Sequence, residues 1–175
     1  MKNFNLNDSI ELLSRMPVTY RALFYGLGGK WTIANEGGDT WSAFDIVGHL
    51  IHGERTDWIP RARIILSDAE EKVFEPFDRF AQKQVSKGKS MDELIDEFEV
   101  LRSENLEQLK SWDLTENDLD KTGTHPGLGT VTLRQLIATW AIHDVNHLNQ
   151  VSRVMVKHYA EDVGPWAEYL KLLQK

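Results

Sequence analysis

The chain has 175 residues, of which 41% are hydrophobic, and its formal net charge is −7. This length suits one domain that covers residues 1–175 and has its own core. The acidic charge argues against nucleic acid as a partner, and the absence of an apolar run near about 18 residues argues against a membrane span. Without cysteine, any metal must bind His, Asp or Glu. No signal sequence precedes the domain, so we expect a cytoplasmic protein.

The first 40 residues are predicted to form two short helices and a loop. Residues 1–16 are amphipathic, and Asp8 with Glu11 has the spacing of a capping box. Pro17 suits the first turn of a second helix that runs through Leu27. Gly28 and the glycine after it are expected to end that helix, and residues 30–40 read as a loop.

A longer helix is predicted from Ser42 to about Leu66, with a kink at Pro60 because proline lacks the backbone N–H. It contains His49 and His52. On a helical wheel both histidines fall away from the apolar stripe, so periodicity predicts that their face is solvated. The pattern alone therefore does not select His49 as a metal ligand.

The middle of the chain is predicted to hold a polar connection, a third helix and a short ribbon. The connection covers residues 67–89, a length that joins helices which are not simple antiparallel neighbours. Ser90 with Glu93 caps the third helix, and its inward positions are Leu94, Ile95, Phe98, Leu101, Leu106 and Leu109. The loop from 112 to 131 contains HPGLGTVT, whose glycines and proline favour a turn between two short strands.

The fourth helix, residues 132–158, carries the most suggestive polar residues. Thr132 and Gln135 form a predicted capping box at its start. His143 and His147 are one turn apart, about 6 Å along the axis, which lets one helix offer two imidazoles to one metal. Two hydrogen-bonded core histidines would produce the same spacing, and a metal needs a third ligand from elsewhere.

Asp144 falls within the apolar stripe of the fourth helix, where an unpaired carboxylate is costly. Two roles fit this position. Asp144 accepts a hydrogen bond that orients a metal-bound histidine, with a His or Arg partner such as Arg102, or it forms an ordinary buried salt bridge.

These elements predict an all-α fold, a four-helix bundle with long crossover connections. Gly164 and Pro165 break the chain after the fourth helix, and a short tail helix with Trp166 and Tyr169 follows. Cores of such bundles hold metals between side chains of facing helices, which makes the second helix a natural source of the third ligand.

The motifs WSAFDIVGHL and HPGLGTVTLRQLIATWAIHDVNHLNQ resemble the DinB/YfiT-like superfamily of bacterial four-helix-bundle proteins. The shared pattern is a Trp-led second helix ending in His-Leu, an HP-x-x-G-x-VTL start to the fourth helix, and then H-x-x-x-H-x-x-Q. All three parts occur here in order, and PFDRFAQ and VGPWAEYL extend the resemblance over almost the whole chain.

The resemblance implies a divalent metal, zinc or nickel, held by His49, His143 and His147. Gln150 matches the closing Gln of the pattern, and His52 is a rival ligand on the second helix. Periodicity places His49 on a solvated face, whereas the resemblance makes it a metal ligand. Both can hold if the polar face of the second helix lines an internal pocket. Four further residues are candidates for contacts to the metal ligands or for the wall of the pocket: Asp144, Gln150, Glu54 and Trp58. The resemblance also implies a homodimer.

Three imidazoles leave a metal position open for water or a small-molecule substrate. Similarity to several relatives implies an S-transferase that joins a low-molecular-weight thiol, such as bacillithiol or mycothiol, to a small electrophile. The sulfur must then come with the cosubstrate, because the chain has no cysteine. The alternatives are a metal-dependent hydrolase with Glu54 or Asp144 as general base, and a non-catalytic, stress-linked metal-binding protein.

Overall fold

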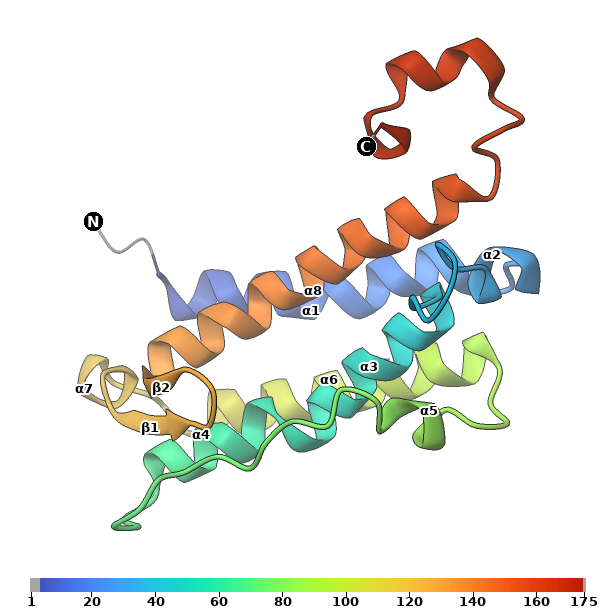
Figure 1. Ribbon diagram of the computed structural model, residues 1–175. Helices are drawn as coiled ribbons and strands as arrows, with labels where there is room; N and C mark the ends of the chain where they lie inside the picture. Colours follow the sequence, from blue (N-terminus) through green and yellow to red (C-terminus); the bar gives the residue numbers. More distant parts are fainter. Residues whose placement is uncertain (1–3, 175) are drawn as a thin grey trace.

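The computed structural model describes residues 4–174, and within this range four helical rods make up a bundle (Figure 1). The rods are α1 (Leu6–Phe24), the pair α3 (Ala43–Thr56) and α4 (Trp58–Leu66), α6 (Met91–Ser111) and α8 (Leu133–Lys157). The shorter elements are α2 (Gly29–Ile33), α5 (Gln82–Val85), α7 (Glu116–Leu119), β1 (Thr122–His125), β2 (Gly129–Thr132), and the 3₁₀ turns η1 (Gly164–Tyr169) and η2 (Lys171–Leu173). The predicted all-α bundle is confirmed.

The order of the helices around the bundle explains its long connection. Helix α1 packs against α6 and α8, and α3 packs against the same two helices from the other side. Figure 1 shows α3 and α6 running in the same direction, with the connection between them returning along the bundle. Residues 67–89 are therefore a true crossover, as their length predicts.

Three capping boxes define the helices around the site. Ser42, Ser90 and Thr132 each accept a hydrogen bond from the backbone three residues on, and the side chain at that position bonds back to the cap. The predicted ribbon is also present, because β1 and β2 pair antiparallel from Thr122↔Thr132 to His125↔Gly129. Local side-chain chemistry thus determines where α3, α6 and α8 begin.

The prediction of two short helices before residue 28 is wrong, because α1 is continuous. Its cap is Asn5, whose side chain accepts from the backbone of Asn7 and Asp8; the first three residues of the amphipathic segment lie outside the described part. Pro17 lies inside the helix and leaves the Leu13 carbonyl without its usual N–H partner. Arg102 Nη1 donates to that carbonyl at 2.9 Å, which compensates the missing bond.

The predicted single helix from 42 to 66 is divided at Asp57, which has φ −111° and ψ −69°. Pro60 is the physical reason, because it has no N–H to offer the Thr56 carbonyl four residues earlier. The chain resumes as α4 with a hydrogen bond from Arg61 N to the Asp57 carbonyl. Asp57 is thus both the C-cap of α3 and the N-cap of α4.

Two apolar clusters fill the bundle, and a polar layer lies between them. On α6 one cluster includes Phe98 and the other Leu106, with Arg102 between these positions. Arg102 donates to Asp144 Oδ2 and to Glu54 Oε1, both at 2.7 Å. Glu54 also accepts from Asn105 and from Trp140 Nε1. The guanidinium and both carboxylates are almost fully buried.

Two further expectations concern the outside of the molecule. In Figure 1 the tail after α8 loops out from the end of that helix, η2 returns to contact α8, and Trp166 and Tyr169 are exposed. The predicted tail helix has 3₁₀ geometry.

The homodimer stays a prediction, because the structure holds a single chain. Among the described residues, no helix is long and apolar enough to cross a membrane.

Replacing Arg102 by Leu is expected to destabilise the metal-free protein by about 3–5 kcal/mol, because two buried carboxylates lose their counter-ion. Urea denaturation of the metal-free protein measures this change. The matched control is Arg21→Leu, which removes a half-buried surface Arg paired with Asp96 and Glu99 and should change stability little. Equal effects of the two substitutions would contradict a structural role for the Arg102 layer.

Candidate metal centre

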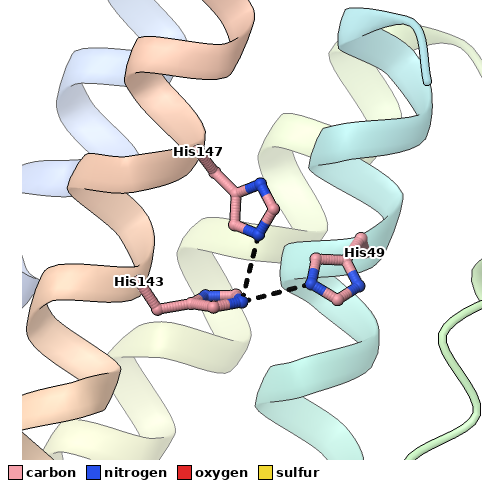
Figure 2. A group of neighbouring side chains, drawn as sticks. All are labelled: His49, His143 and His147. Carbon is pink, nitrogen blue, oxygen red and sulfur yellow. Dashed lines mark hydrogen bonds between the residues drawn. The ribbon is translucent and has the colours of Figure 1, made fainter. Parts of the chain in front are cut away.

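Three histidine rings converge between α3 and α8 (Figure 2). His143 Nε2 lies 3.2 Å from His49 Nε2 and 3.1 Å from His147 Nε2. One nitrogen from each ring falls within 4.8 Å of the other two. The structure therefore brings together the three histidines that the resemblance selects.

The prediction that the His49 face of α3 is solvated is wrong, because the crossover covers it. Phe77 packs edge-on against His49 with 5.4 Å between ring centroids. A Cβ added to Gly48 would lie 2.3 Å from Ser86 Oγ, so the crossover runs directly against α3 at this residue. The polar face of α3 thus lines the interior.

His52 is buried but does not join the cluster. Its ring packs against Phe77, with 4.8 Å between centroids. His52 and His49 are three residues apart on α3, yet only His49 meets the two rings of α8. His49 thus has the geometry of the third ligand, and its role as a ligand stays a prediction.

Gln150 determines the orientation and tautomer of His147. Its side-chain oxygen lies 2.9 Å from His147 Nδ1, so Nδ1 carries the proton and donates it. The lone pair of His147 is then on Nε2, which faces His143. Such an outer hydrogen bond is the usual support of a metal-binding imidazole. The buried Nδ1 atoms of His49 and His143 have no corresponding partner among residues 4–174.

The geometry of the cluster is consistent with a divalent metal. Nitrogens bound to zinc at about 2.0–2.1 Å in a tetrahedral arrangement lie about 3.3–3.4 Å apart. The two Nε2 separations of 3.1 and 3.2 Å are close to this value. Three Nε2 atoms that face one another cannot all be satisfied by mutual hydrogen bonds, whereas one cation can accept all three lone pairs.

The protonation state also suits metal binding. Burial, together with the neighbouring rings of His147 and His143, lowers the pKa of His49 to about 3. Burial and His143 lower the pKa of His147 to about 4. Both rings are therefore neutral at pH 7, which is the form that binds metal.

Glu54 and Asp144 do not reach the place where a general base would act. Both carboxylates pair with Arg102 and are fully shielded from solvent. Asp144 Oδ1 is 3.9 Å from His143 Nδ1, which is too long for a hydrogen bond. The salt-bridge role that the sequence left open for Asp144 is present, and the predicted hydrogen bond to a histidine ligand is not.

A cavity of about 300 Å³ opens beside His49 and His143. Its walls come from α3, α4, the crossover, the hairpin and the start of α8, and its lining includes Asp57, Trp58, Arg61, Phe74, Phe77, His125, Leu128, Val131 and Leu136. Trp58 is thus a pocket residue, and its ring centroid is 5.1 Å from that of His143. The cavity links the histidine cluster to a largely apolar space.

Asp57 is the carboxylate of this cavity. It is 8% exposed and pairs with Arg61 Nε at 2.5 Å. Burial raises the pKa of Asp57, and the charge of Arg61 only partly opposes this rise. A buried carboxylate with a raised pKa beside a candidate metal centre is a candidate acid or base.

Sequence reasoning missed Asp57, and it treated His125 only as part of a turn. The Asp57–Arg61 spacing of four residues is a visible signal for an ion pair on one helix face. Nothing local indicates that this pair faces a cavity, because its other walls come from residues up to position 143.

A second cavity of about 570 Å³ borders the opposite part of the cluster. His49 and Phe77 line both cavities, while Trp41, Arg79, His147, Gln150 and Arg153 belong to the second one alone. Arg79 lies over the Trp41 ring at 5.4 Å. The histidine cluster is thus accessible from two chemically different spaces.

Replacing His49, His143 or His147 by Ala should abolish stoichiometric metal binding, because two nitrogens from this set cannot complete the site. His52→Ala is the matched control on α3 and should retain one equivalent. Elemental analysis after dialysis measures the content. A His143→Ala protein that keeps one equivalent of zinc or nickel would rule out this ligand set.

The metal-free protein should lose stability as pH falls from about 6.5 towards 4. The unfolded histidines protonate near pH about 6.5, whereas the folded values for His49 and His147 are about 3 and about 4, so the unfolded state binds more protons in this window. Urea denaturation at pH 7.5 and 5 tests the sign. The double variant His49→Gln, His147→Gln should lose less stability over the same range; an equal loss would contradict the assignment.

Comparisons with known proteins identify the family. The family model described as the DinB superfamily matches residues 12–151. The solved structure of YfiT from Bacillus subtilis, described as a probable metal-dependent hydrolase with an unusual four-helix bundle topology, has a TM-score of 0.70 to this chain at 15% identity and covers 90% of this chain and 91% of its own. No curated protein matches the chain. The chain belongs to the DinB superfamily.

Proposed function

We propose that this protein is a metal-dependent hydrolase of small molecules. The observation that carries the proposal is the cavity in which His49 and His143 share a wall with the buried carboxylate of Asp57. The description of YfiT as a probable metal-dependent hydrolase supports the same chemistry. Hydrolysis also needs no second organic substrate, so one enclosed cavity suffices.

His49, His143 and His147 would hold the metal, for which we propose zinc or nickel because both favour nitrogen ligands. A divalent ion in this place supplies a nucleophile at neutral pH by lowering the pKa of water, and it polarises a carbonyl group. Gln150 orients His147 because its side-chain oxygen accepts a hydrogen bond from the Nδ1–H group.

Asp57 is the proposed general base, in place of Glu54 or Asp144. Burial brings its pKa closer to neutral pH than that of an exposed carboxylate, which favours proton transfer in both directions. Arg61 fixes the orientation of the carboxylate through their ion pair. Trp58 and Phe77 contribute apolar surface to the cavity wall beside Asp57.

A thiol S-transferase is the second candidate, and the two cavities favour it. A transferase needs places for a low-molecular-weight thiol and for an electrophile. In the second cavity Arg153 pairs with Glu36, whereas Arg79 suits an anionic group of a thiol such as bacillithiol, and the first, more apolar cavity suits the electrophile. A third candidate, a metal-binding protein without activity, predicts no turnover in either assay.

Asp57→Asn should reduce kcat for ester or amide hydrolysis by about 10²–10⁴-fold, because it removes the proton acceptor. The assay uses zinc- and nickel-loaded protein with a panel of small aryl and alkyl esters and amides. Elemental analysis should give the same metal content as for the parent. The matched control, Asp68→Asn, changes an exposed carboxylate outside both cavities and should keep full activity.

Turnover of a thiol with a haloalkyl substrate, combined with no hydrolysis by the parent protein, would replace the hydrolase proposal by the transferase. Hydrolysis that persists in Asp57→Asn would leave the hydrolase class intact and remove Asp57 as its base.

A further inference from the structure

The hairpin wall of the apolar cavity holds a histidine that the chemistry above does not use. His125 is the last residue of β1 and lines the same cavity as His143. Its Nδ1 accepts hydrogen bonds from the backbone N–H groups of Gly127 and Leu128, at 3.1 and 3.2 Å. The HPGLG turn thus determines how this ring is held.

These two bonds determine the tautomer of His125. A ring nitrogen that accepts hydrogen bonds keeps its lone pair, so the proton of the neutral imidazole must be on Nε2. Nε2 has no hydrogen-bond partner within residues 4–174. His125 therefore offers one uncommitted N–H donor on the wall of the cavity.

The donor is also held rigidly. Thr124, the residue before His125, bonds to the crossover through Phe74 N at 2.9 Å and the Lys72 carbonyl at 2.7 Å. A Cβ on Gly123 would approach the Phe74 ring to 2.7 Å, so the strand and this ring are in close contact. A donor fixed before the ligand arrives costs no reorganisation during binding or reaction.

The rest of the lining defines the ligand that suits this donor. Trp58, Phe77, Leu128, Val131 and Leu136 give the cavity apolar walls. Its two charged side chains, Asp57 and Arg61, pair with each other, and Gln135 and Thr139 add polar groups to the lining. A volume of about 300 Å³ admits only a small molecule. A small, largely apolar ligand with an acceptor oxygen for the His125 donor is complementary to this cavity.

We propose that His125 is a catalytic residue whose Nε2–H binds the carbonyl oxygen of a small, apolar ester or amide in this cavity. The reaction role rests on the proposed hydrolase function, whereas the recognition of a carbonyl oxygen by the N–H group does not.

In the proposed hydrolysis every proton and electron pair is accounted for. Water adds to the carbonyl carbon and gives a proton to Asp57, while the π pair of the C=O bond moves to the oxygen. His125 Nε2–H hydrogen-bonds that oxygen and keeps its own proton. When the C=O bond re-forms, the bond to the alcohol or amine breaks, and Asp57 returns the proton to this leaving group. The sum is an ester or amide and water giving an acid and an alcohol or amine.

The tautomer is tested first, without any substrate. ¹⁵N NMR of the imidazole nitrogens of the zinc-loaded protein at pH 7.5 should show the His125 proton on Nε2, with the resonances assigned by their loss in His125→Asn. A proton on Nδ1 would overturn the proposal, because the ring would then offer no donor from Nε2.

Two substitutions of His125 distinguish its role as Nε2–H donor from its role as Nδ1 acceptor for the backbone of the turn. In His125→Asn the side-chain oxygen can replace Nδ1 as acceptor for the turn, but nothing replaces Nε2. In His125→Gln the side-chain amide can replace the Nε2–H donor, but the acceptor for the turn is lost. The matched control is His158→Phe, an exposed histidine outside the cavity.

Acetophenone, a small apolar ketone that cannot be hydrolysed, is the binding probe. Calorimetry should show about tenfold weaker binding to His125→Asn, near-parent binding to His125→Gln and no change in His158→Phe. In ester hydrolysis, kcat of His125→Asn should fall about 10²–10³-fold at unchanged metal content, with most activity kept by His125→Gln. Parent-like behaviour of both variants, or a larger loss in Gln than in Asn, would overturn the proposal.

The two proposals fail in different ways. Acetophenone binding that depends on the His125 donor, without hydrolysis of any ester, would reject the hydrolase function and its catalytic step but keep the recognition of a carbonyl oxygen. Hydrolysis that proceeds equally well in His125→Asn would reject the role of His125 and keep the hydrolase.

Discussion

The structure depends on one buried guanidinium. Arg102 lies 2.7 Å from both Glu54 and Asp144, and it also donates to the Leu13 carbonyl. These partners come from α3, α8 and α1, so a single side chain of α6 connects all four rods of the bundle. A buried charge is tolerated only when it is paired and hydrogen-bonded, and a shift of any one helix would break one of these bonds. The layer therefore determines how the helices are aligned along the bundle axis.

This alignment positions the candidate metal centre. Asp144 follows His143 directly on α8, and Glu54 lies one and a half turns beyond His49 on α3, so the polar layer and the histidine cluster lie close to each other along the bundle. Glu54 accepts from Trp140, Trp140 stacks on Trp58 with 6.0 Å between centroids, and Trp58 packs against His143 at 5.1 Å. A continuous set of contacts thus runs from the salt-bridge layer to the cluster.

The predictable features are those set by neighbouring residues. Ser42, Ser90 and Thr132 cap helices through side chains three residues away, and the HPGLG turn forms its own hydrogen bonds, so local patterns were sufficient. Burial of His49 depends instead on a crossover that returns over α3, and Pro17 is accommodated within α1 by Arg102, 89 positions from Leu13. No local pattern contains either contact. The three-His set needed the family resemblance for the same reason, because its third member comes from 94 positions away.

The carboxylates of the Arg102 layer stabilise the bundle, whereas the carboxylate proposed for the chemistry is a different one. Glu54 and Asp144 lie close to the histidines in sequence, yet Arg102 holds both as its counter-ions, and neither lines either of the two cavities beside the cluster. Protonating either of them would leave the Arg102 guanidinium buried with less compensation and would weaken the contacts that align the helices. Asp57 lines the cavity, and its partner Arg61 lies on α4, whose N-cap is Asp57, so this ion pair does not connect different rods of the bundle. Proton transfer at Asp57 can therefore proceed without disturbing the contacts that align the bundle.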